Sequence, residues 1–151
     1  MEWEVPWRRT VVAVGLVLAS AGTSCSVVDR PDATDWDTRA DQALTDASSE
    51  VATSRLALDT AARERTWSSY AVVVLAQAEE AMATVEDDLA RLQVPTGRSE
   101  RAEEVLAVLE SAASAVSDAR ASAVEGELDD DATLGALDEV AAELDRATDG
   151  G

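Results

Sequence analysis

Apolar residues recur along most of the chain at alternating spacings of four and three, which is the period of one helix face. Such series occupy residues 40–61, 71–92, 102–123 and 134–148. Their members are, in order, Ala40, Leu44, Ala47, Val51, Ser54, Leu58 and Ala61; Ala71, Val74, Ala78, Ala81, Val85, Leu89 and Leu92; Ala102, Val105, Leu109, Ala112, Val116, Ala119 and Ala123; and Leu134, Leu137, Ala141, Leu144 and Thr148. The pattern predicts four amphipathic helices.

The first two series are separated by a polar stretch. The first helix is expected to begin at Thr34 or Asp35, because either side chain could cap its first turn. Residues 63–69 are polar and shift the apolar phase by one position. The shift predicts a turn followed by a second helix over about residues 68–93, although a single kinked helix would also fit.

The later boundaries are marked by glycine and proline. Residues 94–97 (Val-Pro-Thr-Gly) break the second helix, Ser99 is the expected N-cap of the third, and Gly126 is expected to end it. Four helices with short connections predict an all-α fold, an antiparallel bundle of three long helices plus a shorter C-terminal helix, over residues 35–149. Because its seams are rich in alanine, we expect modest stability and self-association along an incompletely covered face.

The charge and residue types exclude several classes of protein. The chain has 12 arginines, 31 acidic residues, no histidine and a formal net charge of −19. Histidine-dependent catalysis and histidine-ligated zinc are therefore excluded, and so is a cation-rich surface for nucleic acid. A single cysteine cannot form an intramolecular disulfide. No nucleophile and base can be paired, so the sequence predicts a protein that is not an enzyme and has no cofactor.

The N-terminal segment has the three parts of an export signal. Arg8 and Arg9 are followed by the apolar run 11–21, by Gly22-Thr23-Ser24, and by Cys25. The lone cysteine after small residues resembles the lipobox of bacterial lipoproteins. This resemblance implies that residues 1–24 are a signal peptide and that the Cys25 thiol receives a diacylglyceryl group, with palmitate among the acyl chains. Residues 25–34 would then be a tether on the outer face of the cell membrane.

Alternative interpretations of this segment remain open. Residues 8–12 (Arg-Arg-Thr-Val-Val) resemble a twin-arginine export signal, while general secretion would also fit. Residues 10–28 contain no charge and could remain uncleaved as a membrane anchor. Cys25 could also be an inert, small apolar residue.

The middle of the chain resembles a group of actinobacterial helical lipoproteins of uncharacterised function. The resemblance spans roughly residues 45–127 and lies in seam segments such as 48–53, 70–74 and 101–109. A genome rich in G and C fits the same source, because Lys, Asn, Ile and Phe are absent while Ala occurs 30 times. The resemblance implies a helical fold and a lipid anchor, and it brings no catalytic residue with it.

Three aromatic residues follow the export signal. Trp36 is expected near the start of the first helix, while Trp67 and Tyr70 are expected at the turn between the first two helices. The two groups would therefore lie at opposite ends of the bundle. The simpler interpretation is that each side chain fills one end of the alanine-rich core. The alternative is that Trp67 and Tyr70 form a partner-binding surface.

Carboxylates are the abundant reactive groups. Glu127 and Asp129 to Asp131 could hold Ca²⁺, but they lack the alternating order of a calcium loop, so a turn that caps the fourth helix is the simpler prediction. Residues 79–80 and 86–88 are expected to be a solvated acidic face.

These observations favour one function and one alternative. The first is a non-enzymatic helical module, anchored outside the cell membrane through Cys25, that binds an envelope protein or acts as a spacer. The alternative is a binding protein for a small cationic ligand or metal ion.

Overall fold

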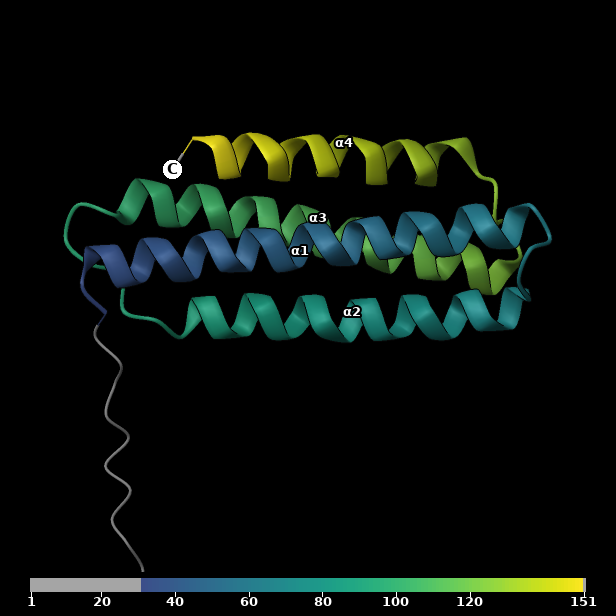
Figure 1. The fold of residues 1–151 in the computed structure, drawn as a ribbon, viewed down its shortest axis with the longest axis horizontal. Coiled ribbons are helices and arrows are strands. Elements are labelled where there is room, and N and C mark those ends of the chain that lie inside the picture. Colours follow the sequence, from purple (N-terminus) through teal and green to yellow (C-terminus); the bar gives the residue numbers. More distant parts are fainter. Residues whose placement is uncertain (1–30, 151) are drawn as a thin grey trace, which may run out of the picture.

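The computed structural model describes residues 31–150, which form four α-helices. They are α1 (Ala33–Ala62), α2 (Ser68–Ala90), α3 (Ser99–Glu125) and α4 (Asp131–Asp149). Consecutive helices run in opposite directions (Figure 1). The predicted all-α antiparallel bundle, with three long helices and a shorter C-terminal one, is therefore confirmed. The predicted signal peptide, Cys25 and residues 26–30 of the predicted tether lie outside the described residues.

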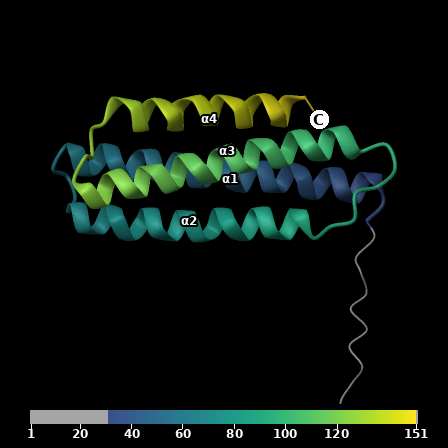
Figure 2. The same cartoon turned by 180° about the vertical axis from the view of Figure 1, so that it is seen from behind.

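Helices α1 and α3 form the middle of the bundle, with α2 on one side and α4 on the other (Figures 1 and 2). Both α2 and α4 contact α1 and α3, and α1 and α3 also contact each other, but α2 and α4 do not meet. Alanine explains this arrangement, because its small side chain lets helix axes approach closely. The buried alanines of the two middle helices are Ala40, Ala43, Ala47, Ala57 and Ala61 of α1, and Ala102, Ala112, Ala115, Ala119 and Ala123 of α3.

The predicted seams of α1 and α3 are confirmed, since every member of both series is buried. Larger side chains complete the core between the alanines, among them Trp36, Leu44, Leu58, Leu109 and Leu144. Ser54 is the one buried polar residue among those described, and its hydroxyl oxygen has no hydrogen-bond partner there.

The predicted seam of α2 is wrong in part. Leu75 and Met82 are fully buried, whereas the predicted Val74 and Ala81 are only partly buried. Residues 71–76 are all apolar, so the pattern contains no polar residue that would fix the orientation of this turn. Packing decides it, because the larger Leu and Met side chains fill more of the core than Val and Ala.

The fourth seam needs a similar correction. Leu137 and Leu144 are buried as predicted, but Val140 and Ala147 complete the buried face of α4. The predicted Leu134 and Ala141 are partly buried, and Thr148 is exposed. Thr148, the predicted seam residue with a polar side chain, is thus the most exposed of the five.

Two predicted N-caps are wrong by one to three residues. Asp32, not Thr34 or Asp35, caps α1, because its Oδ1 accepts hydrogen bonds of 2.9 Å from the backbone N–H groups of both. Ser99 is the first helical residue of α3, and Arg98 occupies the N-cap without a capping side-chain bond. The guanidinium of Arg98 is instead paired with Asp37.

The remaining boundaries agree more closely with the sequence. A turn over residues 63–67 separates α1 from α2, so the single kinked helix is excluded. Helix α2 ends at Ala90 and not near Gln93, because Leu92 N–H bonds to Leu89 O in a tighter turn. Gly126 ends α3 as predicted, with the left-handed φ of 86° that glycine adopts readily. Within residues 31–150, no helix is long and apolar enough to cross a membrane.

Candidate functional site

The bundle has two chemically different ends. The Asp32 end contains the start of α1, the α2–α3 connection and the last turn of α4. The Trp67 end contains the α1–α2 and α3–α4 connections. Helix α1 has 30 residues, so the two ends are about 45 Å apart at 1.5 Å per residue. Cys25, the predicted lipid site, precedes the Asp32 end in sequence and lies outside the described residues.

Trp67, Tyr70 and Val73 form an exposed apolar patch at the start of α2, which we call the Trp67 patch. Their exposed fractions are 83%, 61% and 53%. The prediction that Trp67 and Tyr70 fill one end of the core is therefore wrong. Trp67 is the N-cap of α2, where the chain is still extended, and its side chain lies outside the helix packing. The structure brings both predicted partner-binding residues onto one accessible surface.

Trp36 behaves as the sequence predicts for a core residue. It lies in the first turn of α1 and is 1% exposed. Its indole nitrogen has no hydrogen-bond partner among the described residues. Trp36 and the Trp67 patch lie at opposite ends of the bundle, so no aromatic cage is formed within one chain.

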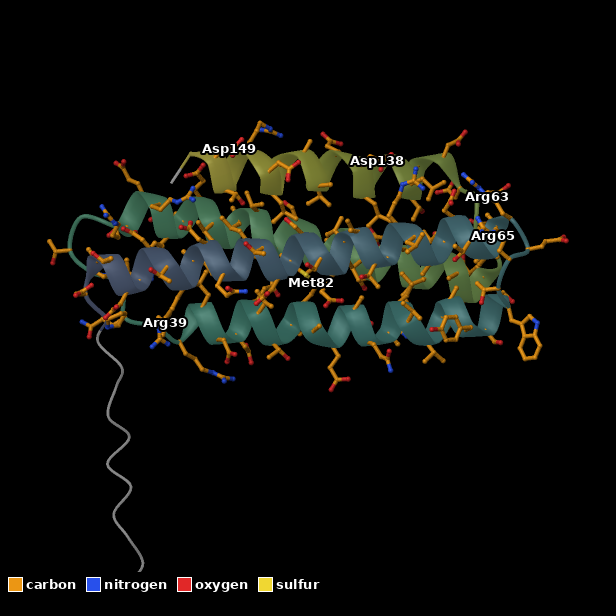
Figure 3. The ribbon with its side chains drawn as sticks, in the orientation of Figure 1. Arg39, Arg63, Arg65, Met82, Asp138 and Asp149 are labelled. Atoms are coloured by element: carbon orange, nitrogen blue, oxygen red, sulfur yellow. The ribbon has the colours of Figure 1, made fainter. Side chains whose placement is uncertain are left out.

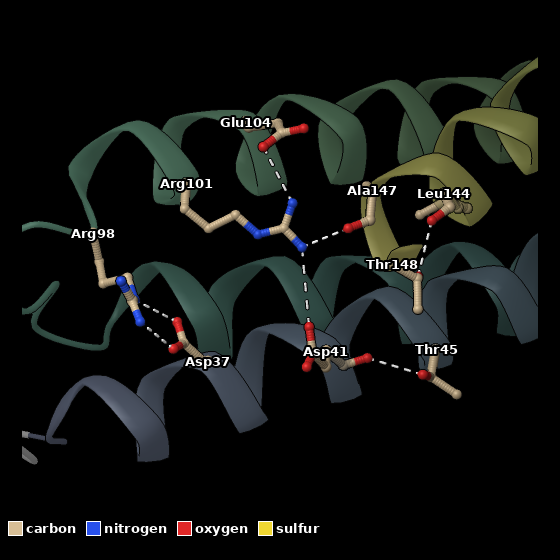
Figure 4. A network of polar contacts seen from close by, with 9 residues as sticks. All are labelled: Asp37, Asp41, Thr45, Arg98, Arg101, Glu104, Leu144, Ala147 and Thr148. Carbon is tan, nitrogen blue, oxygen red and sulfur yellow. Dashed lines mark hydrogen bonds and ion pairs between the residues drawn. The ribbon is translucent and has the colours of Figure 1, made fainter. Parts of the chain in front are cut away.

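An ion-pair network ties three helices together at the Asp32 end (Figure 4). Arg98 donates two parallel hydrogen bonds to Asp37, with Nε–Oδ1 and Nη2–Oδ2 distances of 2.7 and 2.6 Å. The hydrogen bonds from the guanidinium lower the pKa of Asp37, and the carboxylate raises that of Arg98 in return. This pair fixes the start of α3 against α1.

Arg101 makes the central contact of the same network. Its Nη1 donates a 3.1 Å hydrogen bond to Glu104, and its Nη2 donates to the backbone carbonyl of Ala147. Asp41 lies 4.0 Å from the same Nη2. The Ala147 carbonyl is in the last turn of α4, where carbonyls have no partner within the helix. Arg101 therefore caps α4 from α3.

Replacing Arg101 by methionine is expected to lower the free energy of unfolding by about 1–3 kcal/mol, since a buried carbonyl loses a charged donor. The Arg101 side chain is only 16% exposed. Arg91→Met is the matched control, because that side chain is 70% exposed and pairs within its own helix, so the expected loss is about 0.5 kcal/mol or less. Urea denaturation followed by circular dichroism measures both. Equal losses would contradict a capping role for Arg101.

One feature of the sequence is a sign of this network. Arg98 and Arg101 stand at the beginning of α3, where the helix dipole favours negative charge. Two arginines there are locally unfavourable, which indicates partners on other helices. The partners themselves, Asp37 and the Ala147 carbonyl, could not be identified from spacing within one helix.

A shallow acidic groove of about 390 Å³ runs between α2 and α3. Its acidic lining residues are Glu79, Glu86, Glu110 and Asp118. Glu79 accepts a 2.8 Å hydrogen bond from Ser117 and lies 2.6 Å from Arg120 Nε. Burial, together with the nearby Glu110 and Asp87, raises the pKa of Glu86. The predicted solvated face is thus confirmed for the exposed Glu80, Asp87 and Asp88, while Glu79 and Glu86 are partly buried against α3.

The acidic α3–α4 turn caps α4, which confirms the simpler of the two predictions for this turn. Asp130 accepts hydrogen bonds of 2.8 and 2.7 Å from the backbone N–H and the hydroxyl of Thr133. These bonds lower the pKa of Asp130. Among residues 31–150, no group of three or more acidic, cysteine or histidine side chains is arranged to hold a metal ion.

The pKa shifts of Glu86, Asp37 and Asp130 predict that the free energy of unfolding passes through a maximum in mildly acidic solution. Glu86 has a pKa above its ordinary value of 4.5, so protonation favours the folded chain and stability rises as the pH falls from 7 towards that value. Asp37 and Asp130 have pKa values below 3.8, so their contributions persist above pH 3.8 and are lost as the pH falls further. Urea denaturation across this range measures the curve. Glu86→Gln should flatten the rise and exposed Glu80→Gln should not; a monotonic curve would contradict the prediction.

Comparison of the chain with protein-family models, with curated proteins and with solved structures found no match. The functional interpretation therefore depends on the sequence features and the geometry described above.

Proposed function

We propose that this protein is a membrane-anchored extracytoplasmic lipoprotein whose helical bundle is a non-enzymatic interaction or spacer module. The observation that carries the proposal is the order of features before the bundle. Two arginines, an apolar run and three small residues lead to Cys25, and only six residues, 26–31, separate Cys25 from the cap Asp32. A fully extended connection of that length spans roughly 25 Å, which would keep the bundle close to the membrane.

The Trp67 patch supports an interaction role for the bundle. Tryptophan and tyrosine are enriched among the residues that dominate binding at protein interfaces. An exposed Trp–Tyr–Val surface on a chain of net charge −19 costs solubility unless a partner covers it. The partner would be an envelope protein or a second copy of the chain.

Intact mass spectrometry of the protein from its native membrane tests the anchor. The expected mature chain begins at Cys25 and carries the mass of a diacylglyceryl group and an added acyl chain. Cys25→Ala is expected to lose the lipid mass, while Ser26→Ala retains it. A protein that begins at Met1 without lipid mass, or that fractionates with the cytosol, would contradict the proposal.

A second candidate function is the binding of a small cation in the acidic groove. The observation that favours it is the groove itself, which is lined by Glu79, Glu86, Glu110 and Asp118. A bound cation would reduce the repulsion among these carboxylates. Melting temperatures measured with Ca²⁺ and with a polyamine test it. A rise in melting temperature that Glu86→Gln abolishes supports this candidate. A melting temperature that neither Ca²⁺ nor the polyamine changes contradicts it.

A further inference from the structure

A second series with coiled-coil spacing runs along a side of α2 that is exposed except at Val74 and Ala81, which are partly buried. Its members recur at alternating spacings of three and four: Trp67, Tyr70, Val74, Gln77, Ala81, Thr84 and Asp88. We call this series the outer seam. Residues 66–78 contain no charged side chain, although the whole chain has a net charge of −19. Four of the seven members, Trp67, Tyr70, Val74 and Ala81, are apolar, and apolar residues at this spacing occur where another helix packs against them.

The outer seam leads from the Trp67 patch into an apolar groove at the other end of the bundle. This groove lies between α1 and α2 and has a volume of about 300 Å³. Ala43, Val85 and Leu89 are among its apolar lining residues, and Arg39, Asp46 and Asp88 are among its polar ones. Figure 3 shows Arg39 at this end, far from Arg65 at the other. A projecting indole and an apolar recess therefore lie on one side of the same helix, at opposite ends.

Arg65 adds an exposed positive charge in the turn that leads to the Trp67 patch. It is exposed and has no ion-pair partner among residues 31–150. By contrast, the neighbouring Arg63 is paired with Asp59 at 2.8 Å. The chain is strongly acidic. An arginine that lies near an exposed tryptophan and is not paired with a carboxylate is therefore suited to contact an acidic partner surface.

We propose that a second copy of this chain covers the outer seam, with the two α2 helices antiparallel about a two-fold axis at Gln77. The proposal rests on the proposed function by identifying the partner of the Trp67 patch. Gln77 is ten residues from Trp67 and eleven from Asp88, so the axis places Trp67 of each copy over the groove of the other, about 15 Å from the centre. Such an interface is self-complementary, because projection and recess occur twice.

Charge complementarity favours the antiparallel orientation of the two α2 helices over a parallel one. In the antiparallel arrangement, Arg65 of each copy lies near Asp88 at the rim of the other copy's groove. The uncharged residues 66–75 of each copy lie opposite residues 79–88 of the other, so the acidic residues of the two α2 helices are not set against one another. A parallel arrangement would instead place Asp88 against its own counterpart. Because the two copies repel each other over the rest of their surfaces, added salt should strengthen the dimer by screening that repulsion.

Site-specific disulfide formation tests the axis in the full-length chain, purified in a non-ionic detergent. Gln77→Cys places the two introduced thiols side by side, so mild oxidation should yield a covalent dimer. The chain without that substitution controls for Cys25, and Glu103→Cys, at an exposed position on α3, controls for random collision. Dimer yield that is no higher for Gln77→Cys than for these controls would overturn the proposal.

Sedimentation equilibrium of the same full-length chain tests the contacts. Trp67→Ala is expected to raise the dimer dissociation constant at least about thirtyfold, as truncating a dominant interface residue does. Arg65→Glu should weaken the dimer, and adding Asp88→Arg should restore it. A monomer at every concentration, or a dimer indifferent to Trp67→Ala, would overturn the proposal. The lipid mass at Cys25 is measured separately, so failure of the dimer and failure of the anchor are distinguishable.

Discussion

Replacing Trp36 by alanine is expected to lower the free energy of unfolding by about 3–5 kcal/mol, the usual cost of truncating a buried large aromatic residue. Trp36 is 1% exposed at the Asp32 end of the core. Alanine would leave a cavity there, because it is far smaller than tryptophan and the next residue of the α1 seam, Ala40, is small as well. Trp36 is the one aromatic side chain buried among the described residues, so the loss should be a large share of the total stability.

Trp67→Ala is the matched control, because it removes the same side chain from a position that is 83% exposed. The expected change is within about 0.5 kcal/mol, measured by urea denaturation at a protein concentration low enough for the monomer to predominate. Similar losses for the two variants would mean that the Trp67 side chain packs into the core.

Leu75→Ala is expected to lower the free energy of unfolding by about 2–5 kcal/mol. Leu75 is fully buried where α2 faces the core. Val74→Ala is the neighbouring control. Val74 is only partly buried, and alanine has the higher helix propensity, so we expect a change within about 1 kcal/mol. Thermal and urea unfolding of both variants would reveal the orientation of α2. A larger loss for Val74→Ala than for Leu75→Ala would contradict this orientation of α2.

The difference between these two residues shows what the pattern of apolar residues can and cannot predict. Every predicted member of the α1 and α3 seams is buried, because polar residues interrupt the apolar ones within each turn everywhere except at residues 105–109. In α2, residues 71–76 are uniformly apolar, so several orientations bury similar area and only the tertiary packing distinguishes them. The caps Asp32 and Arg98 were missed for a related reason, since several adjacent polar residues could each end the helix.

The candidate functional residues also differ in how far the sequence predicts them. Trp67 and Tyr70 could be identified from the sequence as residues at a turn, but their exposure could not, because an aromatic side chain beside a helix start can pack either inwards or outwards. The contacts of Arg98 and Arg101 join residues far apart in the chain, so no local pattern predicts them. Cys25 has the opposite status: it is predicted from the sequence alone and lies outside the described residues.

The absence of contact between α2 and α4 in the described bundle bears on how the protein unfolds. Helix α4 is the shortest of the four and packs only on the middle pair, so its detachment would leave every contact among the other three helices intact. Sub-global opening of this kind gives different segments different protection against deuterium uptake. The amides of α4 would then exchange ahead of those of α1 and α3, and this helix would behave as a separate cooperative unit.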